Sequence, residues 1–148
     1  YFPDVLILDY IGLFDPGDGR RYPGGMEGEK LKKEAAARKF RNICSEFGIV
    51  GHTADQVDNI APADYNNPAW YITRWNCNLA KGLPESFSFV FTWNVTRDEY
   101  NNNTGRIYAD KLREYKGNFI FPIATNFDRD RFYDRSRTLD LFSDVYNK

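Results

Sequence analysis

The chain has 148 residues, of which 42% are hydrophobic, 17% aromatic and 28% charged, and its formal net charge is −1. These values are typical of one globular domain with a sizeable core, and they exclude a strongly basic nucleic-acid-binding protein; nucleic-acid binding would need a local basic patch. No segment reaches the roughly 18 apolar residues of a membrane helix, no signal peptide is visible, and Cys44 and Cys77 stand in no zinc-binding pattern, so we expect a cytoplasmic protein with reduced thiols.

The first element is a continuous apolar run, "VLIL", which predicts a fully buried strand over residues 4–9. The strand ends on Asp9. Because α/β folds bind ligands beyond the carboxyl ends of parallel strands, Asp9 is a candidate metal-binding or catalytic carboxylate. The alternative is an acid that caps the next turn. The chain begins at Tyr1, without methionine and only three residues before this strand, so we expect it to be a piece of a longer protein.

A Gly- and Pro-rich stretch, residues 15–28, predicts a mobile surface loop that carries Arg20 and Arg21. Basic loops of this kind often contact a nucleic-acid backbone, although plain solvated surface is the competing interpretation. Residues 29–47 predict an amphipathic helix, and Gly48 is suited to the left-handed position that follows it. Its apolar stripe consists of Ala36, Phe40, Ile43, Cys44 and Phe47.

Residues 49–57 predict a second short strand, followed by a loop over residues 58–67. Gln56, at the end of this strand, would project from the same sheet edge as Asp9, where its amide could hold a water molecule or a phosphate oxygen. His52 is the only histidine, and no G-x-S-x-G motif offers it a nucleophile, so it reads as a polar strand residue.

The second half of the chain predicts one helix and three strands. Asn67 followed by Pro68 is a good helix start, and the helix would run to about Lys81. Strands are expected over residues 86–95, 106–113 and 118–126, with a turn over residues 97–105.

The order of these elements predicts a three-layer α/β core in which parallel strands are followed by an antiparallel C-terminal hairpin. Lys111 and Arg113 stand two residues apart in a predicted strand, so both side chains would point to one face. Two interpretations stay open for this pair. The cations could be solvated charges at a sheet edge, or they could be aimed at phosphates.

Taken in order, these segments resemble the second half of the RecA-like ATPase domain of DnaB-type replicative DNA helicases, including their phage relatives. "VLILDYIGLF" resembles the Walker B strand, "HTADQV" the sensor strand that ends in glutamine, "ADKLR" a Lys-x-Arg pair and "FDRDRFYD" the closing hairpin. The resemblance implies a partial RecA-like P-loop NTPase core that spans residues 1–148 as a single partial domain and starts at the Walker B strand.

The resemblance also implies roles for individual residues. Asp9 would orient Mg²⁺ through water, and Gln56 would sense the γ-phosphate. Arg113, together with Lys111, would be a finger that reaches the nucleotide of the neighbouring subunit.

The implied cofactors of the full-length protein are ATP and Mg²⁺, and its partners are single-stranded DNA and the other subunits of a homo-hexameric ring. Arg20 and Arg21 would face the DNA. No Walker A motif occurs in the 148 residues, so we expect the chain alone to be inactive and to bind no nucleotide tightly. We also expect it to self-associate or rearrange its sheet, because a RecA-like sheet without its P-loop strand has exposed edges.

Other functions fit the same residues. The chain could be a non-catalytic RecA-like module, or a fragment of a recombinase or clock-type ATPase that acts through protein–protein contacts. A third possibility is an unrelated α/β enzyme that uses Asp9 and His52.

Overall fold

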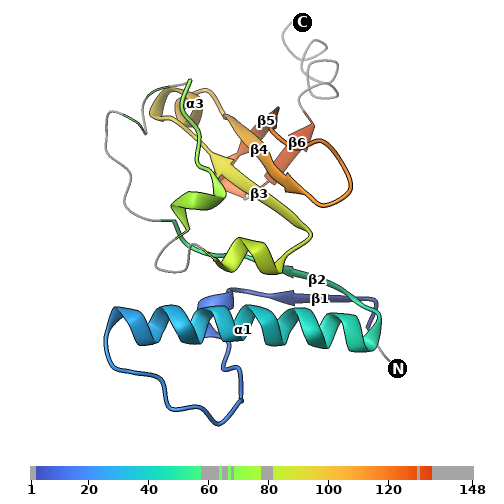
Figure 1. Cartoon of the computed structure of the whole chain (residues 1–148). Helices are drawn as coiled ribbons and strands as arrows, with labels where there is room; N and C mark the ends of the chain where they lie inside the picture. Colours follow the sequence, from blue (N-terminus) through green and yellow to red (C-terminus); the bar gives the residue numbers. More distant parts are fainter. Residues whose placement is uncertain are drawn as a thin grey trace, which may run out of the picture. The chain divides into compact units, whose positions relative to one another are not determined.

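The computed structural model describes residues 3–57, 64, 67, 69–77, 82–129 and 131–134. The contacts within the chain group it into two compact units (Figure 1). Unit 1 comprises Tyr1–Asn59 and Arg74–Ser88, and unit 2 comprises Ile60–Thr73 and Phe89–Lys148. No helix among the described residues is long and apolar enough to span a bilayer.

Unit 1 consists of two parallel strands packed against one long helix. Strand β1 (Val5–Leu8) pairs in parallel with β2 (Val50–Thr53), and this confirms the predicted parallel strands. Helix α1 (Met26–Phe47) lies along them, as Figure 1 shows. The unit also contains three short 3-10 turns: η1 (Ile11–Leu13), η2 (Arg74–Asn76) and η3 (Leu83–Ser86).

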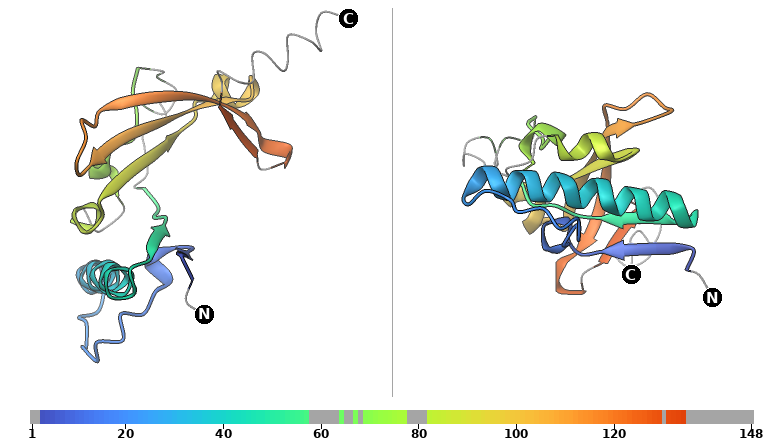
Figure 2. Two further views of the ribbon diagram at one scale, coloured as in Figure 1. Left: turned by 90° about the vertical axis from the view of Figure 1, so that its right-hand side faces the viewer. Right: turned by 60° about the horizontal axis from the view of Figure 1, so that its bottom comes forward.

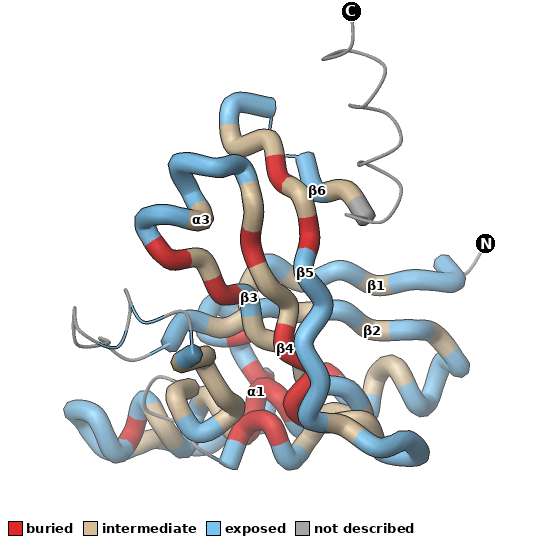
Figure 3. Tube along the Cα trace, turned by 90° about the horizontal axis from the view of Figure 1, so that it is seen from above, coloured by how far each residue is buried: buried red, intermediate tan, exposed pale blue. Residues whose placement is uncertain are grey.

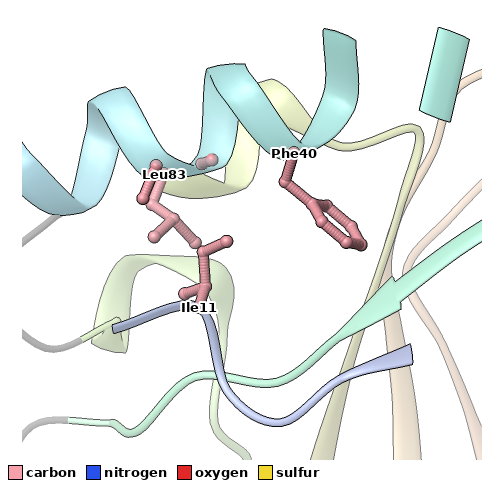
Figure 4. Packing of buried hydrophobic residues seen from close by; sticks show 5 residues of the cluster. Ile11, Phe40 and Leu83 are labelled. Atoms are coloured by element: carbon pink, nitrogen blue, oxygen red, sulfur yellow. The ribbon is translucent and has the colours of Figure 1, made fainter. Parts of the chain in front are cut away.

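The core of unit 1 lies between α1, η1 and η3. Ile11 and Leu83 point toward each other beneath the helix, and Phe40 projects from the helix beside them (Figure 4). Ile11 is 0% exposed and Phe40 is 2% exposed, so each contributes close to its full burial free energy, about 1.5–3 kcal/mol. Leu6 and Leu8 pack against this cluster from one face of β1.

The predicted helix is confirmed, although it begins three residues earlier, at Met26. Gly48 follows it with φ 63°, the left-handed conformation that its position requires. The predicted burial of the first strand is wrong. Exposed and half-buried residues alternate along β1, and Ile7 is 74% exposed (Figure 3). Among the described residues, α1 covers only the face that carries Leu6 and Leu8.

Unit 2 is an antiparallel sheet with the strand order β3-β4-β5-β6. Figure 2 shows β3, β4 and β5 running side by side as a curved ribbon. The predicted C-terminal hairpin is therefore confirmed, within a larger antiparallel sheet, whereas a three-layer core is not found among the described residues. The elements are β3 (Phe89–Asn94), α3 (Arg97–Asn101), β4 (Thr104–Leu112), β5 (Phe119–Asn126), η4 (Phe127–Arg129) and β6 (Arg131–Asp134).

The predicted turn over residues 97–105 is wrong in its first half, because α3 forms there. Thr96 caps this helix. Its side chain accepts from the Glu99 backbone N–H at 3.2 Å, and the Glu99 carboxylate accepts from the Thr96 N–H at 2.7 Å. This reciprocal pair is a capping box, and the sequence pattern T-x-x-E is its signature.

The predicted helix over residues 68–81 is wrong where it can be compared. Residues 70–73 are irregular, only η2 is helical, and Cys77 forms an antiparallel bridge with Val57. Side chains of β3 already bond this backbone: Thr92 Oγ1 donates to the Ile72 carbonyl at 2.5 Å, and the Ile72 N–H donates to Asn94 Oδ1 at 2.5 Å. Residues 58–63 of the predicted loop lie outside the described residues.

One face of the unit 2 sheet carries exposed aromatic side chains. The register places Phe91 opposite Ala109, Trp93 opposite Ile107, and Ile107 opposite Phe121, so these residues share a face. Apolar side chains here remain in contact with water. The exposed aromatic residues of this face, which we call the aromatic face, are Phe89, Phe91, Trp93, Phe119, Phe121 and Phe132.

Candidate functional site

Asp9 and Gln56 lie at the same edge of the parallel sheet in unit 1. The register pairs Leu8 with Thr53, so β1 and β2 end together. Asp9 is the first residue after β1, whereas Gln56 lies three residues beyond the end of β2, not within the strand as predicted. Both residues are exposed. The sheet edge therefore presents a carboxylate and an amide to solvent from neighbouring strands.

Two hydrogen bonds tie these strand ends together. Thr53 Oγ1 donates to the Leu8 carbonyl at 2.8 Å, and the Ile11 N–H donates to the Ala54 carbonyl at 3.1 Å. The turn that follows Asp9 is thus hydrogen-bonded to the segment that leads to Gln56. The peptide bond that follows Asp9 is cis.

A buried ion pair lies next to Gln56. Lys33 Nζ of α1 is 2.7 Å from Asp55 Oδ1, and the two side chains are only 11% and 7% exposed. Sequence analysis did not single out this pair. The two residues stand on different elements, and neither belongs to a recognisable motif, so nothing in the pattern of residues indicates their contact.

Lys111 and Arg113 belong to unit 2. Lys111 lies on β4 opposite Val90, next to a register shift in the pairing of β3 with β4. Strand β4 ends at Leu112, so Arg113 stands just beyond it, exposed. Because Arg113 lies outside β4, the alternation of strand side chains does not decide whether the two cations share a face. Their roles stay predictions.

The comparisons with known proteins find similar structures but no similar family model or curated sequence. No family model matches the sequence, and no curated protein matches it. The structure of a DnaB-like replicative helicase, solved to show its interactions with primase, matches with a TM-score of 0.67 at 12% identity over 87% of this chain. A second solved structure, described as an ATPase domain, matches with a TM-score of 0.68 at 12% identity over 88% of this chain.

The chain has the fold of part of a replicative helicase ATPase domain. The resemblance noted in the sequence is thereby confirmed at the level of the fold. The chain spans 30% of the DnaB-like helicase chain and 44% of the chain of the second structure.

Asp9 is an exposed carboxylate at this sheet edge, and carboxylate oxygens are ligands that Mg²⁺ accepts. No group of three or more His, Cys, Asp or Glu side chains among the described residues could hold a metal ion. Asp9 is therefore a single carboxylate ligand at most. In nucleotide sites Mg²⁺ is held by one or two carboxylates together with phosphate oxygens and water, so a lone acid suits this use.

The loop between η1 and α1 borders an open depression of about 520 Å³, which Arg20 lines and Arg21 does not. Arg20 Nε lies 3.7 Å from Asp18 Oδ2, and the Tyr22 hydroxyl donates to the same oxygen at 2.6 Å. The Tyr22 hydrogen bond is the main reason that the pKa of Asp18 lies below its usual value. Arg20 is thus partly engaged within its own loop, whereas Arg21 is exposed.

Unit 2 contains a polar cluster that sequence analysis also missed. Arg106 Nε lies 2.7 Å from Glu99 Oε1, and Arg106 Nη1 donates to the Trp70 carbonyl at 3.2 Å. The cluster connects the capping box of α3 to β4 and to the irregular segment beside it. Because the charges of Arg106 and Glu99 satisfy each other, we read the cluster as structural.

We assign no role in the site to His52 or to the two cysteines. His52 lies on β2 opposite Ile7, with an exposed side chain. Cys44 and Cys77 are free, and burial raises the pKa of the Cys44 thiol, which disfavours its reactive thiolate form.

Proposed function

We propose that this chain is part of an ATP-dependent replicative DNA helicase, in which nucleotide hydrolysis drives movement along single-stranded DNA. The observation that carries the proposal is the shared edge of Asp9 and Gln56, within a fold similar to helicase ATPase domains. Parallel α/β sheets place ligands at such edges, beyond the carboxyl ends of their strands.

Each of the two residues suits one task at a nucleotide. Asp9 is an exposed carboxylate that would hold water on a Mg²⁺ ion, which in turn would neutralise phosphate charge. Gln56 offers an amide that can donate to a phosphate oxygen or hold a water molecule. The segments after β1 and β2 are hydrogen-bonded to each other, so a displacement of Asp9 can displace Gln56, and the reverse.

Arg113 and Lys111 would act on the nucleotide of a neighbouring subunit in a ring. An arginine finger stabilises the charge of the phosphoryl-transfer transition state and is worth on the order of 10³–10⁵ in rate. Arg113 is exposed at the end of β4, which suits a residue that reaches another chain. Arg20 and Arg21 would contact the DNA backbone, because exposed cations in a Gly-rich loop can follow phosphates.

The phosphate-binding loop would come from residues outside these 148, since the sequence contains no G-x-x-x-x-G-K-[ST] motif. The chain alone is then inactive. A second candidate function is a non-catalytic RecA-like module that works through protein contacts, and the aromatic face of unit 2 favours it, because exposed apolar patches mark interaction surfaces.

The test is ATP hydrolysis by the protein that contains this chain together with a P-loop, measured with and without single-stranded DNA. Asp9→Asn is expected to abolish DNA-stimulated turnover. Asp4→Asn is the matched control, because Asp4 is an exposed acid at the opposite end of β1. Equal turnover by the two variants would contradict the role of Asp9. Turnover by the 148-residue chain alone, lost on Asp9→Asn, would contradict the need for a separate P-loop.

A further inference from the structure

We propose that the Lys33–Asp55 ion pair is a positioning device that fixes Gln56 at the edge it shares with Asp9. The proposal rests on the proposed function for its consequence in catalysis, but its geometric part stands on unit 1 alone. Lys33 and Asp55 are positioning residues, because they act through Gln56.

The segment that carries Gln56 is anchored on both sides. The Ala54 carbonyl accepts from the Ile11 N–H at 3.1 Å, and Asp55 is 2.7 Å from Lys33. Val57, the residue after Gln56, forms an antiparallel bridge with Cys77. Gln56 is therefore an exposed residue whose flanking residues are each held by another part of the unit.

Lys33 contacts the segments that follow both strands. Its ammonium group pairs with Asp55 after β2. Its stem passes the turn after β1, because a methyl group added to Gly12 would lie 3.7 Å from Lys33 Cε. One side chain of α1 thus spans the distance between the turn after Asp9 and the segment of Gln56.

Because the pair is buried, the Asp55 carboxylate needs the Lys33 ammonium to balance its charge. The Asp55 side chain is 7% exposed, and Lys33 Nζ lies 2.7 Å from its Oδ1. The Lys33 ammonium is therefore the group that balances the buried charge. Removing one partner of a buried pair is strongly destabilising, whereas replacing both by apolar residues is often neutral. This contrast allows positioning to be separated from stability.

The ion pair also holds the segment of Gln56 to α1. Lys33 lies in the first half of α1, and the loop with Arg20 and Arg21 directly precedes that helix. A shift of the Gln56 segment must either move α1 with it or break the pair.

The first experiment measures the backbone order of Gln56 by ¹⁵N relaxation in the 148-residue chain. The deciding variant is Lys33→Met with Asp55→Leu, which removes both charges and is expected to fold. In the wild type we expect an order parameter of about 0.85 for the Gln56 N–H, and in the double variant a value below about 0.6. The amides of α1 and β2 should stay unchanged.

Two further variants complete the design. Lys32→Met removes an exposed neighbouring cation of α1 and should change nothing. The exchange Lys33→Asp with Asp55→Lys restores an ion pair and should recover most of the order at Gln56. A Gln56 N–H that stays as ordered in the double variant as in the wild type would overturn the proposal.

The second experiment measures nucleotide hydrolysis and binding in the protein that contains a P-loop. The double variant should lower kcat at least tenfold while the dissociation constant for the nucleotide changes less than twofold, because positioning acts on the reaction step. A wild type without DNA-stimulated hydrolysis would overturn the proposed function and leave the relaxation result standing. Lost order at Gln56 with an unchanged kcat would overturn the catalytic consequence.

Discussion

Gly51→Ala is the sharpest test of how α1 packs on β2. A Cβ atom built on Gly51 would clash with Cys44 Sγ and would lie 2.8 Å from Phe40 Cε1. Non-bonded carbon atoms prefer about 3.5–4.0 Å, so the helix must move away from the strand or Phe40 must leave its rotamer. Phe40 is 2% exposed and has little room to move.

Two opposing contributions set the expected change in the free energy of unfolding. Forcing a methyl group into a packed core costs roughly 1–3 kcal/mol, and the two short contacts place this case near the upper end. Replacing glycine by alanine at compatible backbone angles stabilises the folded state by about 0.4–1 kcal/mol, because the unfolded chain loses conformational entropy. The free energy of unfolding of unit 1 should therefore fall by about 2 kcal/mol.

The assay is urea denaturation followed by helical circular dichroism. Among the described residues, helix α1 has 22 residues and α3 only five, so most of the helical signal of that part of the chain comes from unit 1. Gly105→Ala is the control, since the three atoms nearest to its Cβ belong to the far end of the Trp93 ring, the first at 2.6 Å, and Trp93 is 37% exposed and can turn away. A Gly51→Ala midpoint indistinguishable from that of the wild type would refute the close packing of α1 on β2.

Two further predictions concern unit 2. Thr96→Ala removes half of the capping box and should destabilise the unit by about 1 kcal/mol, measured by urea denaturation with tryptophan fluorescence, whereas Thr96→Ser should keep nearly full stability. The wild-type chain should self-associate in sedimentation velocity runs, and Phe121→Glu should shift it toward monomer, because Phe121 is 42% exposed on the aromatic face. A monomeric wild type would contradict the second prediction.

The sequence predicted the elements whose signals are local. Periodicity, propensity and one glycine predict the helix that Gly48 follows, the parallel pair of β1 and β2, and the C-terminal hairpin. The same reasoning failed where the structure or burial of a segment depends on contacts with distant parts of the chain. The run "VLIL" looks buried on both faces, but Ile7 is 74% exposed, because burial depends on what covers the strand.

The misses have distinct physical causes. Asn67 followed by Pro68 is a sound helix start, yet the backbone at Ile72 is bonded to side chains of β3 instead. The capping box at Thr96 was visible in the sequence as T-x-x-E, so α3 could have been predicted. The Lys33–Asp55 pair could not, because it joins residues on separate elements without a motif.

The site of Asp9 and Gln56 remains a prediction. Strand order alone placed Asp9 and Gln56 at one sheet edge, and the register of β1 with β2 agrees with it. The finger role of Arg113 came only from the resemblance. Fold likeness at 12% identity supports neither role by itself, so both depend on experiment.

The most direct test of the central claim mixes two inactive variants of the protein that contains this chain and a P-loop. Asp9→Asn removes the acid from a subunit's own site, and Arg113→Ala removes the finger that it lends to its neighbour. Mixed in equal amounts, the two should recover about a quarter of the wild-type rate, since one random head-to-tail interface in four pairs an intact Asp9 with an intact Arg113. Mixtures that stay as inactive as each variant alone would contradict a nucleotide site shared between subunits.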